Sequence, residues 1–272
     1  MIATAPGRPG RPRSRGITMV IDPGLPTGAF TDVVSSHGHL IDLVKFGWGT
    51  CLATRDLSTK LDVLRAAGID FYFGGTLFEH YLWSGRLGEF VQLLRCHRAT
   101  HVEVSNGTIP LDQHDKAGYV RLLSGEFTVI SEVGFKQADR SDQLTPADWV
   151  AAIAEDLEAG AALVTAETRE SGRCGMARAD GTLREDVLGA VLTGIDPARV
   201  LFEAPTKDLQ VALIRAIGPD VNLGNITTAD IVGLETLRLG LRSDTLLELT
   251  PAAPARARGE LIASGARLHV AA

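Results

Sequence analysis

Eight short runs of apolar, often β-branched residues recur along this chain, and each ends in glycine, proline or polar residues. Continuous apolar runs of this length are typical of parallel strands that are buried on both faces. Stretches with helical periodicity lie between the runs. The clearest starts at Thr145 and Pro146, a cap followed by proline at the first helical position, and stops at Gly160. The expected strands are 17–22, 41–46, 71–74, 101–105, 128–133, 162–167, 200–204 and 221–224.

Eight alternations of strand and helix predict a single (β/α)₈ barrel, a fold that typically takes about 250 residues. A doubly wound open sheet is the rival fold, and it usually has a glycine-rich phosphate turn after its first strand. Here the first strand ends in Asp22-Pro23-Gly24, which is not such a turn. We expect an Arg/Pro-rich tail over 1–15, the barrel over 16–250 and a second tail over 251–272.

The composition narrows the class of protein. Its three cysteines, Cys51, Cys96 and Cys174, are scattered, which favours reduced thiols in the cytoplasm over a disulfide framework. No apolar run approaches the ~20 residues of a membrane span. The net charge of −6 disfavours nucleic acid as a partner. We expect a cytoplasmic homo-oligomer that binds a small anionic substrate, and neither membrane nor nucleic acid.

Polar residues gather at the carboxyl ends of the expected strands, the end of a (β/α)₈ barrel where catalysis takes place. We call this end the mouth. Glu103, Glu132 and Glu203 stand inside apolar runs, where an unpaired charge is costly. Strand alternation puts Glu103 and Ser105 on one face, which we expect to be the barrel interior. Other polar residues near strand ends are Asp22, Lys45, Glu79, Asn106, Lys136, Glu167, Arg169, Glu170, Lys207, Asn222 and Asn225.

Two interpretations of these charges stay open. The glutamates could form structural ion pairs with the nearby lysines, of which the chain has only five. Alternatively, carboxylates from several strands could hold Mg²⁺ through oxygen ligands, with lysines and an arginine beside the ion receiving an anion. Asp22 could orient a lysine, bind metal or cap its strand. Trp48, between two glycines, either borders a ligand loop or plugs a tight turn.

Several segments, in this order along the chain, resemble the phosphosulfolactate synthase family. They cover about 16 to 245, nearly the whole expected barrel. The segments are Ile17-Thr18-Met19-Val20-Ile21-Asp22, Val44-Lys45-Phe46-Gly47-Trp48-Gly49-Thr50, Gly74-Gly75-Thr76-Leu77-Phe78-Glu79, Ser131-Glu132-Val133-Gly134, Arg169-Glu170-Ser171-Gly172, Phe202-Glu203-Ala204-Pro205, Val221-Asn222-Leu223-Gly224-Asn225-Ile226 and Gly240-Leu241-Arg242.

The resemblance implies a barrel enzyme, a carbon–sulfur lyase working in the synthase direction, that adds sulfite to phosphoenolpyruvate with Mg²⁺ on a route to coenzyme M. It also implies that Lys136, after the Glu-Val-Gly strand end, donates the proton. We expect Lys45, Glu103 and Arg169 to act with it in catalysis. We expect Glu132, Glu167 and Glu203 to hold the metal. The residues expected to bind substrate are Ser105, Lys207, Asn222, Asn225 and Arg242.

The chain departs from the family pattern at several positions. Pro23 and Phe135 stand where the pattern has lysines, and Asn106 stands where it has aspartate. With Pro23 and Phe135 both facing the mouth, we expect weak use of sulfite and retained binding of phosphoenolpyruvate. The alternatives are therefore a relative that uses another nucleophile or phospho-acid in a specialised pathway, and a non-catalytic, stress-protective relative.

Overall fold

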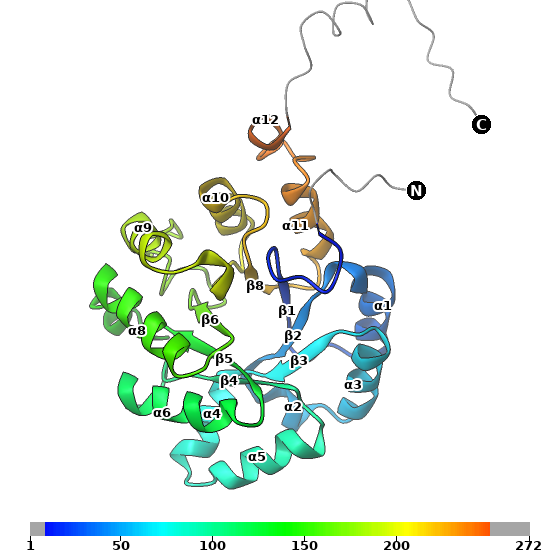
Figure 1. Cartoon of the computed structure of the whole chain (residues 1–272). Helices are drawn as coiled ribbons and strands as arrows, with labels where there is room; N and C mark the ends of the chain where they lie inside the picture. Colours follow the sequence, from blue (N-terminus) through cyan, green and yellow to red (C-terminus); the bar gives the residue numbers. More distant parts are fainter. Residues whose placement is uncertain (1–8, 251–272) are drawn as a thin grey trace, which may run out of the picture.

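A computed structural model describes residues 9–250 and shows eight parallel strands, each followed by helical segments, as predicted. Hydrogen-bonded ladders run in the order β3-β2-β1-β8-β7-β6-β5-β4, and β3 and β4 contact each other, so the barrel is nearly closed. Figure 1 shows the helices surrounding the ring of strands. The strands are β1 Thr18–Asp22, β2 Leu43–Phe46, β3 Asp70–Phe73, β4 His101–Val104, β5 Thr128–Val133, β6 Leu163–Ala166, β7 Val200–Glu203 and β8 Leu223–Ile226.

The helices follow the periodic stretches of the sequence. The helix expected after Thr145 is present as α8, and Thr145 and Asp148 form a capping box at its start. The α-helices are α1 Thr27–His37, α2 Thr50–Ala53, α3 Leu57–Ala66, α4 Gly75–Trp83, α5 Leu87–Cys96, α6 Gln113–Ser124, α7 Ala138–Asp142, α8 Pro146–Glu158, α9 Glu185–Gly194, α10 Lys207–Ile217, α11 Ile231–Arg238 and α12 Leu246–Leu249. Short 3₁₀ turns lie at Gly38–Leu40 (η1), Gly47–Gly49 (η2) and Pro197–Arg199 (η3).

The apolar residues form two clusters separated by the wall of strands. The larger one fills the layer between strands and helices. The smaller one fills the interior of the barrel and consists of Ile17, Met19, Leu43, Tyr72, Ile130 and Leu201. Met19 pairs with Leu43 and lies below Ile21, which pairs with Lys45, so charged residues follow the apolar filling toward the mouth. These apolar side chains separate the buried charges at the mouth from the base of the barrel.

The amino ends of the strands form the base of the barrel, where arginines contact carboxylate and main-chain oxygens. The stretch 9–15, expected to belong to the tail, lies against this base: Arg13 Nη1 is 3.2 Å from Asp42 Oδ2, and Arg11 Nη1 donates to Gly38 O at 2.8 Å. The rest of both predicted tails, 1–8 and 251–272, falls outside the described residues. Within the described range, no helix is long and apolar enough to cross a membrane.

Candidate active site

Six buried or nearly buried charges meet at the mouth, and we call them the mouth cluster: Lys45, Glu103, Glu132, Lys136, Glu167 and Glu203. Period-two alternation explains the arrangement. On β5, the outward residues Ser131 and Val133 flank Glu132, which points into the barrel. Glu203 is the last residue of β7 and Glu167 directly follows β6. Both Glu132 and Glu203 point into the mouth, where Lys45 contacts them.

Lys45, on β2, lies between three of the carboxylates. Its Nζ is 3.1 Å from Glu103 Oε1, 3.4 Å from Glu132 Oε2 and 3.3 Å from Glu203 Oε1. Burial alone would lower the pKa of this lysine, but Glu103, Glu132 and Glu203 outweigh it and raise that pKa well above the ordinary range. Lys45 is therefore a fixed positive charge inside the barrel.

Lys136, in the loop after β5, bridges two carboxylates at the opening. Its Nζ is 2.7 Å from Glu132 Oε1 and 2.8 Å from Glu167 Oε2, and its side chain is 24 % exposed. Burial opposes the charge, yet Glu132 and Glu167 raise its pKa well above the usual value. This ammonium can reach both the carboxylates and a molecule entering the cavity.

The glutamates differ in how readily they ionise. Burial raises the pKa of Glu103 to about 7, with Lys45 opposing and Glu132 adding to the shift. Burial and the charges of Glu132 and Glu203 raise the pKa of Glu167 well above its usual range. For Glu132 burial is outweighed by Lys136 and Lys45, so its pKa lies below the usual range. The mouth cluster holds four carboxylates and two lysines, and it retains protons because it is short of positive charge.

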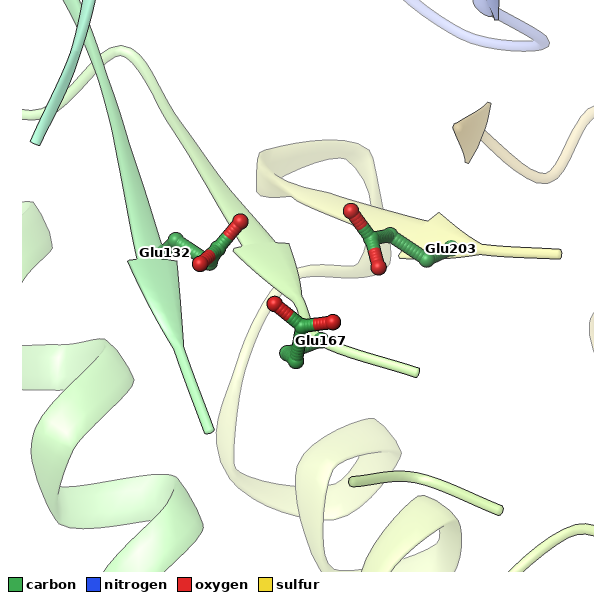
Figure 2. Close-up of side chains that lie close together, drawn as sticks. All are labelled: Glu132, Glu167 and Glu203. Atoms are coloured by element: carbon green, nitrogen blue, oxygen red, sulfur yellow. The ribbon is translucent and has the colours of Figure 1, made fainter. Parts of the chain in front are cut away.

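Glu132, Glu167 and Glu203 form a triad that could hold a divalent metal. Each offers one carboxylate oxygen, and the three oxygens lie within 4.8 Å of one another. Figure 2 shows the three carboxylates turned toward a common space. A set of oxygens without cysteine or histidine suits a hard cation. The carboxylates of the mouth cluster outnumber its lysines by two, and a divalent ion would take the place of the protons that the cluster otherwise retains.

Beside the triad lies a cavity of about 160 Å³, whose wall includes Lys45, Glu103, Lys136, Arg169 and Asn225. The backbone is strained around this cavity, because Trp48, Arg169 and Asn225 have positive φ angles of 50°, 60° and 51°. Among the described residues, Arg98 is the one other non-glycine residue with a positive φ. Such conformations cost on the order of 1–3 kcal/mol each and concentrate at functional sites. Trp48 is 51 % exposed and borders the cavity, so it is not a buried plug.

The other predicted substrate-binding residues do not all reach this cavity. Asn225 lines it, and its buried Oδ1 has no hydrogen-bond partner among residues 9–250. Ser105 is buried directly after β4, and its hydroxyl donates to Glu79 Oε1 at 2.7 Å. Lys207 and Arg242 lie elsewhere, and both pair with Asp244, at 2.9 Å and 3.8 Å.

Asn222 lies at the opposite end of the barrel, and its expected place at the mouth is wrong. It accepts from Ile17 N at 3.0 Å and donates to Ala198 O at 3.0 Å. The physical reason is register: the expected strand 221–224 is displaced, because β8 runs from Leu223 to Ile226. Asn222 thus precedes the strand, whereas Asn225 lies near its carboxyl end.

Two lysines that the sequence did not single out form buried ion pairs in the layer between strands and helices. Lys60 Nζ is 2.6 Å from Asp22 Oδ2, and Lys116 Nζ is 2.7 Å from Asp156 Oδ2. Asp22 also accepts from Gly24 N and Leu25 N at 2.9 and 2.8 Å, so it both pairs with a lysine and caps its strand. A lysine inside an otherwise apolar helical face was the available signal.

The sequence matches the model of the family "(2R)-phospho-3-sulfolactate synthase (ComA)" over residues 6–244. It is 44 % identical over 241 residues to the phosphosulfolactate synthase of Bacillus subtilis, covering 88 % of this chain and 96 % of that protein. It is 41 % identical over 245 residues to the one of Methanothermobacter thermautotrophicus, covering 89 % and 95 %.

Solved structures support the fold. The 3-hexulose-6-phosphate synthase of Salmonella typhimurium superposes with a TM-score of 0.53 over 86 % of this chain and 99 % of that one, at 16 % identity. At that identity the likeness concerns the barrel alone. The family match and the curated relatives cover nearly all of the described barrel. The chain therefore belongs to the phosphosulfolactate synthase family of enzymes.

Proposed function

We propose that this protein catalyses the addition of sulfite to phosphoenolpyruvate and that it requires Mg²⁺. The observation that carries the proposal is the triad of Glu132, Glu167 and Glu203, with Lys45 and Lys136 on its carboxylates, in a member of this family. The triad would hold the ion. When bound, Mg²⁺ would act as a Lewis acid for the carboxylate of the substrate.

The reaction forms one carbon–sulfur bond and one carbon–hydrogen bond. The sulfur lone pair of sulfite attacks the methylene carbon of phosphoenolpyruvate, and the double-bond electrons move toward the carboxylate, giving an enolate-like dianion. A proton added to the carbon that bears the phosphate completes 2-phospho-3-sulfolactate. Charge on the substrate carboxylate is larger in the transition state than in the ground state, so fixed cations such as Lys45 accelerate the reaction.

Lys136 is the proposed proton donor. Its ammonium lines the cavity and is the more exposed of the two lysines in the mouth cluster, with side-chain exposures of 24 % against 8 % for Lys45. Glu132 and Glu167 hold it from one side of the cavity, which would deliver the proton to one face of the intermediate. Arg169, whose Nη1 donates to Lys136 O at 2.9 Å, would bind the anionic substrate at the rim.

A different nucleophile is the second candidate, and one observation bears on it. Pro23, together with Trp48 and Pro205, borders a cavity of about 140 Å³ next to the first, and no lysine or arginine of the described part of the chain lines it. Phe135, in contrast, stacks on Arg140, 3.9 Å from the guanidinium carbon to the ring centroid, and lines a separate cavity. The prediction of weak sulfite use assumed that both Pro23 and Phe135 face the mouth. Phe135 lies at the separate cavity, so only Pro23 still supports that prediction.

The test is a reaction of phosphoenolpyruvate, sulfite and Mg²⁺ with the purified protein, followed by ³¹P NMR and mass spectrometry. We expect 2-phospho-3-sulfolactate, no product after EDTA treatment, and recovery with Mg²⁺ or Mn²⁺. Full turnover in metal-free buffer would refute the metal requirement. A sulfite titration at saturating phosphoenolpyruvate decides between the nucleophiles, because saturation below roughly 1 mM is typical of a true substrate.

A further inference from the structure

The outer face of β5 carries a buried polar network directly behind Glu132. Lys116 comes from α6 and Asp156 from α8, and both side chains are fully buried. Lys116 Nζ lies 2.7 Å from Asp156 Oδ2 and also donates to the main-chain oxygen of Glu132 at 2.8 Å. Ser131 donates its hydroxyl to Asp156 Oδ2 at 2.6 Å. Two helices are thus tied to two consecutive residues of one strand.

Stability alone does not explain this choice of residues. A buried ion pair loses so much hydration that apolar side chains of similar volume often do as well or better. Apolar side chains cannot, however, hold a main-chain oxygen in place. The oxygen that Lys116 binds belongs to Glu132, whose carboxylate contacts Lys45 and Lys136 and takes part in the triad.

We propose that Lys116 is a positioning residue, which together with Asp156 fixes the end of β5 and thereby the Glu132 carboxylate for the metal. It touches neither the substrate nor the metal and acts through the main chain of Glu132. The inference rests on the proposed function, since it assigns the triad to a divalent ion. Outer residues that orient metal ligands typically contribute 10- to 100-fold in metal affinity.

The pair Lys60–Asp22 is a matched control within the same chain. It joins α3 to β1, its distance is 2.6 Å and both side chains are buried. Asp22 Oδ1 holds the backbone N–H groups of Gly24 and Leu25, in the loop after β1, and no residue of the triad. Removing this pair perturbs the layer between strands and helices to a similar degree without touching β5.

The experiment compares Lys116→Met/Asp156→Asn with Lys60→Met/Asp22→Asn in the full-length protein. Each is titrated with Mn²⁺ by calorimetry in the absence of substrate, and its Tm is measured without metal. We expect the Mn²⁺ Kd to rise by ~10-fold or more in the first variant and to stay unchanged in the control, even where both lose a similar amount of Tm. An equal change in both variants, or no change in the first, overturns the proposal.

Two further measurements keep the proposal falsifiable. Should the first double variant not fold, Asp156→Asn is compared with Asp22→Asn, with the same direction expected and a smaller rise in Kd. Should the wild-type protein bind no divalent ion, the metal part of the proposed function fails. Crystal structures of the variants then decide: the 2.7 Å contact between Glu132 Oε1 and Lys136 Nζ is lost only in the variant at Lys116 if the proposal holds, and its retention there contradicts it.

Discussion

The mouth cluster and the two ion pairs outside the barrel wall all consist of lysines and carboxylates, but the numbers of positive and negative groups differ. Lys60–Asp22 and Lys116–Asp156 each match one lysine with one aspartate. The mouth cluster matches two lysines with four glutamates. Without a metal, burial and the neighbouring carboxylates raise the pKa of Glu103 and Glu167, so protons balance the excess of carboxylates, whereas each of the two ion pairs is balanced by its own lysine. The imbalance distinguishes a site awaiting a cation from structural pairs.

We expect the largest loss of activity when one carboxylate of the triad is replaced by an uncharged side chain. Glu203→Gln keeps an acceptor for Thr168 N, now 3.1 Å from Oε2, and removes one negative charge. A metal that stabilises developing charge contributes several kcal/mol, so activity should fall roughly 10³-fold. Mn²⁺ affinity by calorimetry should fall with it. Glu79→Gln removes a buried carboxylate outside the triad and should keep that affinity; equal losses in both variants would argue against a triad site.

For the balanced pair Lys60–Asp22, a single substitution should lower the unfolding free energy more than the double substitution does. Lys60→Met leaves Asp22 buried and unpaired, which typically costs about 3–5 kcal/mol of unfolding free energy. Lys60→Met/Asp22→Asn removes both charges and should recover most of that loss. Urea unfolding of the two proteins measures the difference. A double variant as unstable as the single one would show that the pair contributes more than charge compensation.

Two substitutions of Lys136 distinguish its positive charge from its proposed role as proton donor. Lys136→Ala should lower kcat by ~10²-fold or more with a smaller effect on KM, as for a lost general acid. Lys136→Arg keeps the positive charge on Glu132 and Glu167 but does not release a proton at neutral pH. If the lysine is the acid, steady-state kinetics should show both variants impaired. Near-normal kcat in Lys136→Arg would assign the lysine a purely electrostatic role.

The smallest effect concerns Glu103 in the metal-free protein. Burial raises its pKa from 4.5 to about 7, so the folded state binds this proton more tightly than the unfolded chain. The resulting stabilisation is complete at low pH and is lost as the pH rises through about 7. The unfolding free energy of wild type relative to Glu103→Gln should therefore decrease from pH 4.5 to 7. Denaturant unfolding at several pH values checks this, and a difference that rises with pH would contradict the assignment.

The fold could be predicted because its signals are local and repeated. Buried parallel strands are apolar on both faces, so eight runs stood out, and helix starts such as Thr145-Pro146 carry their own hydrogen-bond chemistry. Glu132 and Glu203 were found for the same reason: a carboxylate inside an apolar run is conspicuous. Strand alternation also predicted that Glu103 points into the barrel, where the structure places it beside Lys45.

The remaining site could not be predicted because it depends on register and on contacts distant in sequence. A displacement of two residues in β8 moved Asn222 from the expected mouth to the base. Lys207 comes soon after β7 and Arg242 lies beyond α11, and both side chains pair with Asp244. Lys116 lies in the first turn of α6, 16 residues before Glu132, and no local pattern reveals that it binds the oxygen of that residue.

The most direct measurement of the central claim is a calorimetric titration of phosphoenolpyruvate into the full-length protein, with and without Mg²⁺. Without a metal, the mouth cluster has no net positive charge to attract a phospho-acid, whereas a divalent ion on Glu132, Glu167 and Glu203 would supply positive charge. The account predicts saturable binding with Mg²⁺, little or none after EDTA treatment, and loss of the Mg²⁺-dependent binding in Glu203→Gln. Binding of equal affinity in the presence and absence of Mg²⁺ would contradict it.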